Sequence, residues 1–193
     1  MLRYLFITPL FAYMLLSQFI MATTYVPIPI DDMMIVIKLE DNKIVLKKTG
    51  QTISYYAGDD GSYKKGLVPS YSRANEVVTD NVTGLQWQDN VEIQDTYMNW
   101  YDAKKYCTDL LLDGGEWRLP IRRELVGLIN YGRMFPSVNP IFVNITSNGF
   151  WSITSNVSYA KTAWSVFFDI GNQSFDGKLS DNRVICVREG FVK

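Results

Sequence analysis

The sequence contains no histidine and only two cysteines among its 193 residues. These shortages exclude Ser-His-Asp and Cys-His nucleophilic sites, zinc sites with histidine ligands and metal clusters held by four cysteines. An excess of positive charge is also lacking, because 19 Lys and Arg stand against 20 Asp and Glu, for a net charge of -1. Proteins that bind nucleic acid neutralise phosphates with such an excess. Nucleic acid is therefore not expected as a partner.

What is present is the composition of an ordinary folded protein, with 47% hydrophobic and 20% charged residues. This length and balance fit one globular domain or two small ones.

The first segment, residues 1–22, has the features of a secretory signal peptide. Arg3 precedes a mostly apolar run from Tyr4 to Met21, and Ala22 stands at a cleavage position. An uncleaved membrane anchor is the alternative, since the run approaches the length that crosses a bilayer. Polar residues dilute the run, which favours cleavage. We expect a secreted, periplasmic or cell-surface protein with no stable membrane span after cleavage.

The two cysteines, Cys107 and Cys186, are expected to pair in such an oxidising compartment. A disulfide that closes so long a loop is worth roughly 4 kcal/mol in the chain-entropy model. Two buried free cysteines are the competing interpretation. They would need a reducing compartment, against which the N-terminal segment argues.

Ahead of the main domain, residues 23–48 read as an extended lead-in followed by a β-hairpin over 33–48. The stretch 49–73 is rich in Gly, Ser, Tyr and Asp and predicts turns joining short strands. Its Gly58–Gly61 cluster is better explained as a solvated turn than as a calcium loop. A second hairpin is expected where the Asp80–Gly84 turn joins two apolar runs. Residues 49–193 form the predicted main domain.

Helices are expected only in the middle of the chain. Asn99 is a good N-cap for a helix that Gly114 and Gly115 would end. A second helix is expected after Pro120 and should stop near Gly132. The expected core stripe of the first helix comprises Trp100, Ala103, Cys107, Leu110 and Leu111, and that of the second comprises Leu125, Leu128 and Ile129.

The last third of the chain predicts short strands at 150–154, 163–168 and 183–188, separated by polar turns. In the second of these, Trp164, Val166 and Phe168 alternate toward one side. The predicted fold class is therefore α+β, with two helices inserted into an antiparallel β framework.

A series of short motifs occurs in a distinctive order along the chain. They are TGQT at 49–52, GDDGSYKKG at 58–66, YSR at 71–73, VTDNVTGLQWQD at 78–89, NWYDAKKYC at 99–107, GGEWRLPIRREL at 114–125, FWSIT at 150–154, AWSVFF at 163–168 and RVICVRE at 183–189. Together they resemble the bacterial Lcl C-terminal domain family, long catalogued as a domain of unknown function. The resemblance covers about residues 49–190.

The resemblance implies a C-type lectin-like fold, with two helices packed on short antiparallel sheets and a loop-rich C-terminal half. In such folds a cysteine on the first helix is bonded to one in the last strand, and Cys107 and Cys186 match those places. Ile121 departs from the family, which often has a polar helix-capping residue there. Members resemble adhesive or recognition modules of bacterial surface proteins, and the namesake adhesin binds sulfated polysaccharide. Its collagen-like stalk has no counterpart here, because the chain has no Gly-X-Y repeat.

The polar residues between the last strands are the leading candidates for ligand binding. Tyr, Ser and Asn build adaptable contact surfaces at low entropic cost, although a solvated loop face explains them equally well. The family resemblance does not bring the Glu-Pro-Asn or Gln-Pro-Asp tripeptide of calcium-dependent lectins, and neither occurs here. The candidates in this segment, residues 144–182, are Asn148, Asn156, Tyr159, Asn172, Ser174, Asp176 and Asn182.

A local concentration of arginines is the secondary candidate, since guanidinium groups can contact sulfate or carboxylate groups bidentately. It comprises Arg118, Arg122 and Arg123, with Arg133 nearby. A solvated helix face neutralised by Glu116 and Glu124 is the preferred interpretation. The adjoining Trp117–Pro120 segment reads as core packing at a corner between helices.

The leading functional hypothesis is a non-enzymatic extracytoplasmic recognition or adhesion module that binds a cell-surface glycan or protein. One alternative is an enzyme on a scaffold like that of the formylglycine-generating enzymes, which depend on reactive cysteines. The other is a structural subunit of the envelope. No catalytic residue, cofactor or metal ligand is predicted.

Overall fold

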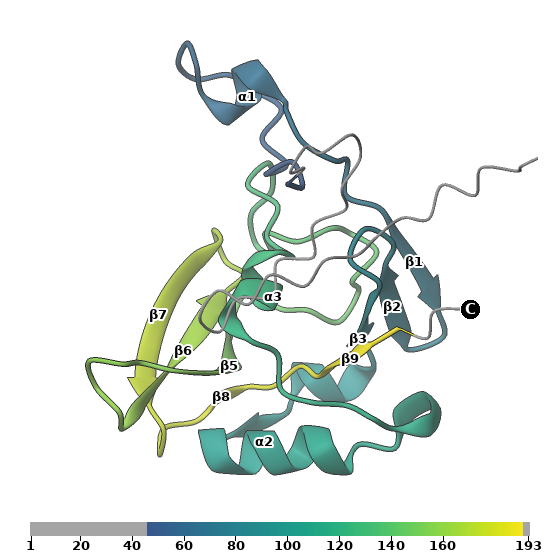
Figure 1. The fold of residues 1–193 in the computed structure, drawn as a ribbon, viewed down its shortest axis with the longest axis vertical. Coiled ribbons are helices and arrows are strands. Elements are labelled where there is room, and N and C mark those ends of the chain that lie inside the picture. The colour runs from purple at the N-terminus through teal and green to yellow at the C-terminus, as the bar shows by residue number, and fades with distance from the viewer. Residues whose placement is uncertain (1–45, 191–193) are drawn as a thin grey trace, which may run out of the picture.

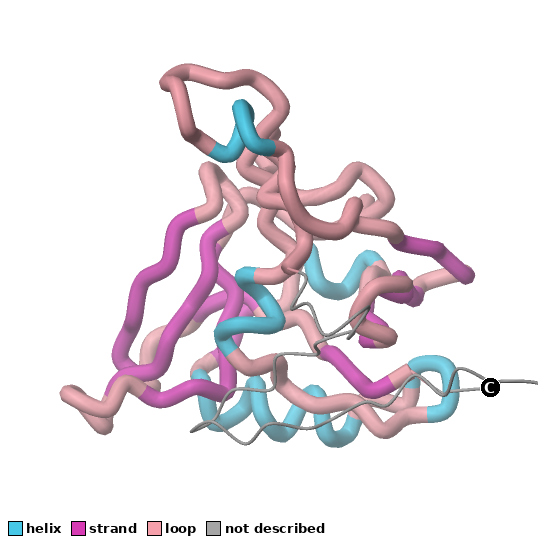
Figure 2. Tube along the Cα trace, turned by 45° about the horizontal axis from the view of Figure 1, so that its top comes forward, coloured by secondary structure: helices cyan, strands magenta, loops and turns pink. Residues whose placement is uncertain are grey.

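The computed structural model describes residues 46–190, and they form two β-sheets joined by helices and long loops (Figures 1 and 2). One sheet has the strand order β1-β2-β3-β9 and the other has the order β4-β8-β5-β6-β7. The helices are α1 (Asp60–Tyr63), η1 (Val91–Gln94), α2 (Trp100–Asp109), η2 (Leu112–Gly114) and α3 (Arg122–Val126). The strands are β1 (Tyr71–Ala74), β2 (Val77–Asp80), β3 (Leu85–Gln88), β4 (Tyr97–Met98), β5 (Gly149–Ser155), β6 (Thr162–Phe167), β7 (Asn172–Gly177), β8 (Asn182–Arg183) and β9 (Val187–Glu189).

The predicted signal segment 1–22 and most of the predicted lead-in and hairpin, 23–48, lie outside the described residues. Those expectations stay predictions. Where the description begins, Leu46 and Lys48 exchange backbone hydrogen bonds with Leu67. Among residues 46–190, no helix is long and apolar enough to cross a membrane.

The turn-rich stretch before β1 contains one turn of helix, α1, that the prediction of turns and short strands missed. Its N-cap is Asp59, whose carboxylate accepts hydrogen bonds from the backbone N–H groups of Tyr55, Tyr56 and Ser62. The bond from Tyr55 is the largest cause that lowers the pKa of Asp59. In Figure 1 this lobe projects from the rest of the molecule.

The smaller sheet contains the hairpin that the turn at Asp80–Gly84 predicts, and β2 and β3 pair antiparallel across it. Gly84 takes a φ of +78° there, a backbone conformation that suits glycine. Two strands complete the sheet. β1 pairs with β2, and β9 pairs with β3 at the C-terminal end of the described chain.

Helix α2 begins where the sequence predicts and ends earlier. The Asn99 side chain accepts hydrogen bonds from the N–H groups of Tyr101 and Asp102, as an N-cap does. Trp100, Ala103 and Cys107 of the expected stripe are buried. Leu111 is 84% exposed, which corrects the expected stripe, because α2 stops at Asp109 and the chain leaves the helical path before η2.

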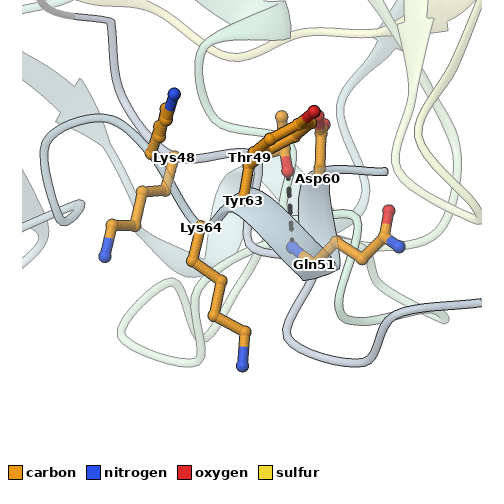
Figure 3. Close-up of a pocket in the computed structure, with 7 residues that line it drawn as sticks. Lys48, Thr49, Gln51, Asp60, Tyr63 and Lys64 are labelled. Carbon is orange, nitrogen blue, oxygen red and sulfur yellow. Dashed lines mark hydrogen bonds between the residues drawn. The ribbon is translucent and has the colours of Figure 1, made fainter. Parts of the chain in front are cut away.

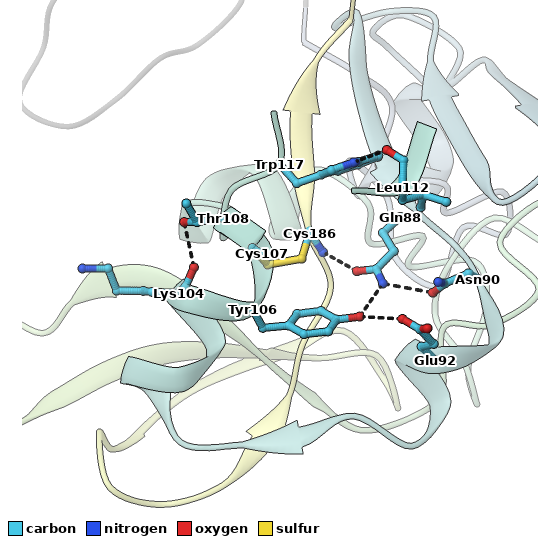
Figure 4. Close-up of a disulfide and its surroundings, with 10 residues drawn as sticks. All are labelled: Gln88, Asn90, Glu92, Lys104, Tyr106, Cys107, Thr108, Leu112, Trp117 and Cys186. Carbon is cyan, nitrogen blue, oxygen red and sulfur yellow. Dashed lines mark hydrogen bonds between the residues drawn. A yellow bond between two sulfur atoms is a disulfide. The ribbon is translucent and has the colours of Figure 1, made fainter. Parts of the chain in front are cut away.

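The disulfide between Cys107 and Cys186 is confirmed and joins α2 to the residue that precedes β9. Figure 4 shows a hydrogen-bonded chain beside it. The Gln88 side chain accepts from the Cys186 N–H at 3.2 Å and donates to the Tyr106 hydroxyl at 2.8 Å. That hydroxyl donates in turn to Glu92 at 3.0 Å. Burial is the main cause that raises the pKa of Tyr106.

Helix α3 spans Arg122–Val126 and is followed by Gly127, so the predicted extent to Gly132 is wrong. The N-cap residue, Ile121, makes no side-chain capping hydrogen bond, and other groups serve the start of the helix. The Ile121 N–H donates to the Glu124 carboxylate at 2.8 Å, and the Arg122 N–H donates to the Thr154 hydroxyl at 3.0 Å. Thr154 belongs to β5, so the start of α3 is set partly by the larger sheet.

The larger sheet separates two hydrophobic clusters. Phe150 pairs with Val166, and both belong to the cluster that includes Leu125 of α3. Trp151 lies next along β5, so it faces the other way and joins the cluster that contains Cys107 of α2. The α+β class is confirmed by this arrangement. The C-type lectin-like assignment is compatible with it and stays a prediction.

Candidate functional site

Several of the predicted ligand-binding residues lie on the β6–β7 hairpin, and the register of its two strands assigns each of them to one of two faces. Directly opposed residues of an antiparallel pair lie on the same face, and neighbours along a strand lie on opposite faces. Trp164 opposes Phe175, whereas Ser165 opposes Ser174. One face of the hairpin therefore carries the Trp164–Phe175 pair, and on the other face β7 contributes only polar residues. Figure 1 shows β7 at the outer edge of the larger sheet.

Three aromatic side chains on the first face form what we call the aromatic row, Tyr159, Phe175 and Trp164. The Tyr159 and Phe175 rings stack with centroids 6.0 Å apart and an interplanar angle of 17°. Phe175 meets Trp164 edge to face at 5.6 Å. Tyr159 is 63% exposed and Phe175 is 43% exposed, while Trp164 is half-buried. The row is thus a contiguous aromatic surface open to solvent.

Arg122 extends the row from α3, because its guanidinium lies 4.3 Å from the centre of the Trp164 ring. Within residues 46–190, that guanidinium has neither an ion pair nor a hydrogen bond to a side chain. A guanidinium stacked on a ring keeps its N–H groups in a fixed plane, directed outward at its edge. It can therefore donate hydrogen bonds to a ligand that rests on the row.

The loop between β5 and β6 holds Tyr159 in place through Asn156. The Asn156 side chain accepts from the Ser158 N–H at 3.0 Å, and its backbone carbonyl accepts from the Tyr159 N–H at 3.2 Å. The Thr162 N–H then donates to the Tyr159 carbonyl at 2.8 Å, just where β6 begins. Asn156 is buried, so it supports the loop from within and does not face a ligand.

The remaining candidates of the C-terminal segment are divided between two other places. Asn172 and Ser174 are exposed on the polar face of β7. On that face the Asp176 carboxylate accepts hydrogen bonds from the Ser165 hydroxyl and the Asn182 amide, each at 3.0 Å. These contacts link β7 with β6 and β8 and occupy the carboxylate internally.

Asn148 lies beside the opposite edge of the sheet, away from the row. Its amide group is 3.0 Å from the Tyr97 hydroxyl on β4. With the amide oxygen turned toward Arg183, it accepts from the Nε of Arg183 at 2.6 Å. The guanidinium of Arg183 stacks 4.5 Å from the centre of the Tyr97 ring. Asn148 therefore joins β4 to β8.

The arginines of the secondary candidate set do not act as one cluster. Arg118 is committed to ion pairs with Glu124 at 2.7 Å and Glu189 at 2.9 Å, and the hydrogen bonds that it donates to Glu124 are the largest cause that raises its pKa. Arg123 is exposed on α3. Only Arg122 meets the aromatic row. The Trp117–Pro120 corner is buried on either side of Arg118, as the core-packing interpretation requires.

A separate pocket of about 240 Å³ lies between the chain at Lys48–Gln51 and the α1 lobe (Figure 3). Three lysines and one carboxylate carry the charges around it. Its lining residues are Lys48, Thr49, Gln51, Asp60, Tyr63, Lys64 and Lys65. None of the residues predicted to bind a ligand lines this pocket.

Among residues 46–190, no three acidic or cysteine side chains come together in a group that could hold a metal ion. The buried carboxylate of Asp89 has structural partners. It accepts from the N–H groups of Val143 and Asn144 at 3.0 Å each and pairs with Arg73. Burial raises the pKa of Asp89, and these hydrogen bonds oppose that shift.

Sequence reasoning named the two ends of the row and missed its middle. The sequence places Tyr159 and Arg122 in two competing candidate sets, and it places Trp164 only among the residues that alternate toward one side of a strand. Phe175 was not singled out. The sequence does carry a signal that Phe175 is exposed. It is the lone aromatic in the otherwise polar run NQSFDG, so it has few apolar neighbours along the chain to bury it.

A family model described as the Lcl C-terminal domain matches residues 76–188, which is more than half of the chain. The matched range contains both cysteines, the three residues of the aromatic row and Arg122. No curated protein matches the chain.

Proposed function

Because the chain belongs to the Lcl C-terminal domain family, we propose that it is a non-enzymatic recognition module that works outside the cytoplasm and binds carbohydrate. The binding surface of this proposal is the aromatic row together with Arg122. The family assignment alone does not fix a ligand, so the proposal depends on the chemistry of that surface.

The single observation that carries the proposal is the continuous contact from Tyr159 through Phe175 and Trp164 to Arg122. A pyranose ring presents C–H groups on its face, and these pack against exposed aromatic rings while its hydroxyls stay hydrated at the rim. Arg122 at the end of the row would donate to a hydroxyl, carboxylate or sulfate oxygen of the sugar. Tyr, Trp and Arg are also the residues that most often dominate binding energy.

The extracytoplasmic part of the proposal is supported by the disulfide, since disulfides persist in oxidising compartments. The predicted signal peptide over 1–22 points the same way. Sequencing the N-terminus of protein recovered from its native envelope tests that prediction. A chain that still begins at Met1 would make it a membrane-anchored protein.

The non-enzymatic part of the proposal is supported by the bonds that possible catalytic groups already make. The chain has no histidine to act as a base, and both cysteines are bonded to each other. Two carboxylates on the elements that carry the row and Arg122, Asp176 of β7 and Glu124 of α3, are held by internal hydrogen bonds. A formylglycine-generating-enzyme-like activity would need a reactive thiol, so a free-thiol assay on the folded protein tests that alternative.

The direct test is a glycan array probed with the purified chain, with and without calcium. The double variant Tyr159→Ala with Phe175→Ala should lose the bound glycans because it removes both exposed rings of the row. Tyr55→Ala with Tyr56→Ala is the matched control, since it removes two exposed rings of the α1 lobe. Binding that survives the first pair, or no binding by the wild type to any glycan, would overturn the proposal, and the second outcome would favour a structural envelope subunit.

A further inference from the structure

The outer edge of β7 has backbone groups without partners in the described part of the chain. In an antiparallel pair, alternate residues direct their N–H and C=O groups to the neighbouring strand, and the others direct them away. The Lys178 N–H donates to the Lys161 carbonyl, while the Thr162 carbonyl accepts from Asn156 on the other side of β6. Because this alternation continues along β7, the N–H and C=O groups of Gln173 and Phe175 point away from β6. Within residues 46–190, neither group of these two residues is hydrogen-bonded on that side.

The strand also lacks the features that usually protect an exposed edge. Natural edge strands carry Lys or Pro, contain a bulge, or point a charge toward the approaching strand. The sequence of β7 is NQSFDG, its register with β6 is unbroken over six residue pairs, and it has no Lys, Arg or Pro. Its one charged residue, Asp176, is turned to Ser165 and Asn182. The edge is therefore open to another strand.

We infer that the partner of this edge is a second copy of the chain, with the two β7 strands antiparallel about a two-fold axis through Ser174. Gln173 of one copy then opposes Phe175 of the other, and each such pair exchanges both N–H···O bonds because both residues direct their groups outward. The two sheets become one continuous sheet.

The side chains of β7 are complementary to themselves in this register. Asn172 opposes Asp176 of the second copy on the polar face, so no two like charges meet there. Ser174 opposes its own copy across the axis. A register centred on Asp176 would bring two carboxylates together and is disfavoured. The antiparallel arrangement also brings Ile170 of one copy, 55% exposed, to the end of the strand that carries the exposed Leu179 of the other.

The dimer would also affect the proposed carbohydrate binding. This effect rests on the proposed function, whereas the dimer does not. A two-fold axis perpendicular to the sheet keeps the aromatic faces of both copies on the same side. Two aromatic rows would then face one surface, and linked sites gain avidity when a ligand reaches both. The dimer itself requires no ligand, so its failure and the failure of carbohydrate binding are separate results.

The test is sedimentation equilibrium of the full chain over a range of concentrations. A strand pair with few flanking contacts is smaller than the ~1,200–2,000 Å² of a stable interface, so we expect a weak dimer that populates at ~10–100 µM. Ser174→Lys should make the chain monomeric, since residue 174 meets only its own copy and two lysines would face each other. Ser174→Asp should do the same. An equimolar mixture of the two variants should restore the dimer, because Lys then faces Asp. Ser158→Lys, at an exposed loop position, is the matched control and should dimerise as the wild type does.

Three results would overturn the inference. One is a wild-type chain that stays monomeric at the highest concentration. Another is a dimer that Ser174→Lys leaves intact, which would place the interface elsewhere. The third is a mixture of the two charged variants that fails to reassociate although both are folded by circular dichroism. That outcome would mean that position 174 does not meet its own copy. The edge would then pair with a different segment or a different protein.

Discussion

The guanidinium of Arg122 stacks 4.3 Å from the centre of the Trp164 ring and joins the start of α3 to the middle of β6. Two observations fix its position. The backbone N–H of Arg122 donates to Thr154 on β5, and Trp164 meets Phe175 of β7 edge to face. The contact between Arg122 and Trp164 thus depends on residues of three strands and one helix.

Arg122→Ala is expected to weaken glycan binding by about 10-fold or more, because a hydrogen bond to a charged group contributes about 1.5–3 kcal/mol. Arg122→Lys should rescue only part of the loss, since an ammonium group lacks the planar fork that stacks on Trp164. Arg123→Ala is the matched control on the exposed side of α3. Titration of each variant against a glycan identified on the array gives the dissociation constants. Equal losses for both alanine variants would indicate a general effect of charge.

Tyr159→Ala and Asn172→Ala are expected to behave differently, although both residues lie in the segment predicted to bind. Tyr159 belongs to the aromatic row and Asn172 to the polar face of β7. Loss of the Tyr159 ring should weaken binding by about 3–10-fold, since an aromatic pair contributes about 0.5–1.5 kcal/mol beyond its burial. Asn172→Ala should shift the unfolding free energy by no more than about 0.5 kcal/mol because the position is exposed, and Tyr159→Ala should lower it by no more than about 1.5 kcal/mol through loss of the stack on Phe175. The reverse pattern of binding would place the ligand on the polar face.

Local signals in the sequence suffice to predict some elements of the fold. Asn99 and the Asp80–Gly84 turn predict a helix start and a hairpin because their side chains and backbone act within a few residues. By contrast, β7 has an exposed, mostly polar sequence, and its strand conformation depends on pairing with β6. The start of α3 likewise depends on Thr154, which is 32 residues away.

The candidate site follows the same rule. The residue types of Tyr159 and Arg122 were informative separately, since each is common at binding surfaces. Their connection through Phe175 and Trp164 depends on the register of β6 with β7 and on the packing of α3 against the sheet. No spacing along the chain encodes those contacts, so the sequence placed the two residues in rival hypotheses.

Removal of the disulfide, by Cys107→Ala with Cys186→Ala, is expected to lower the free energy of unfolding by about 2–5 kcal/mol. The bond ties α2 to the end of the chain across 79 positions, and both cysteines are fully buried. Urea denaturation measures the change. Wild-type protein unfolded and refolded under reducing conditions is the control and should show a similar loss. A change below about 1 kcal/mol would mean that the bond contributes little stability, and a role in chemistry would then have to be reconsidered.

The stability of the protein is expected to fall at alkaline pH because of Tyr71. Burial, together with the nearby Asp80 carboxylate, raises the pKa of this tyrosine well above its usual value. The folded state therefore holds the phenol proton more tightly than the unfolded state does. The resulting stability is fully present below the unfolded pKa of about 10 and is lost as the pH rises toward the folded pKa. Tyr71→Phe removes this contribution while keeping a ring to meet Phe142, whose centroid is 5.4 Å away.

Urea denaturation at a series of pH values between about 8 and 11 measures the effect, since the unfolded phenol titrates within that range. The slope of unfolding free energy against pH should be less negative in Tyr71→Phe than in the wild type. Part of the slope should remain, because burial also raises the pKa of Tyr106. Tyr101→Phe is the matched control, since it removes a hydroxyl from a ring that is exposed on α2. If Tyr71→Phe and the wild type lose stability in parallel, the phenol of Tyr71 ionises as readily in the folded chain as in the unfolded one, and its burial does not control its proton.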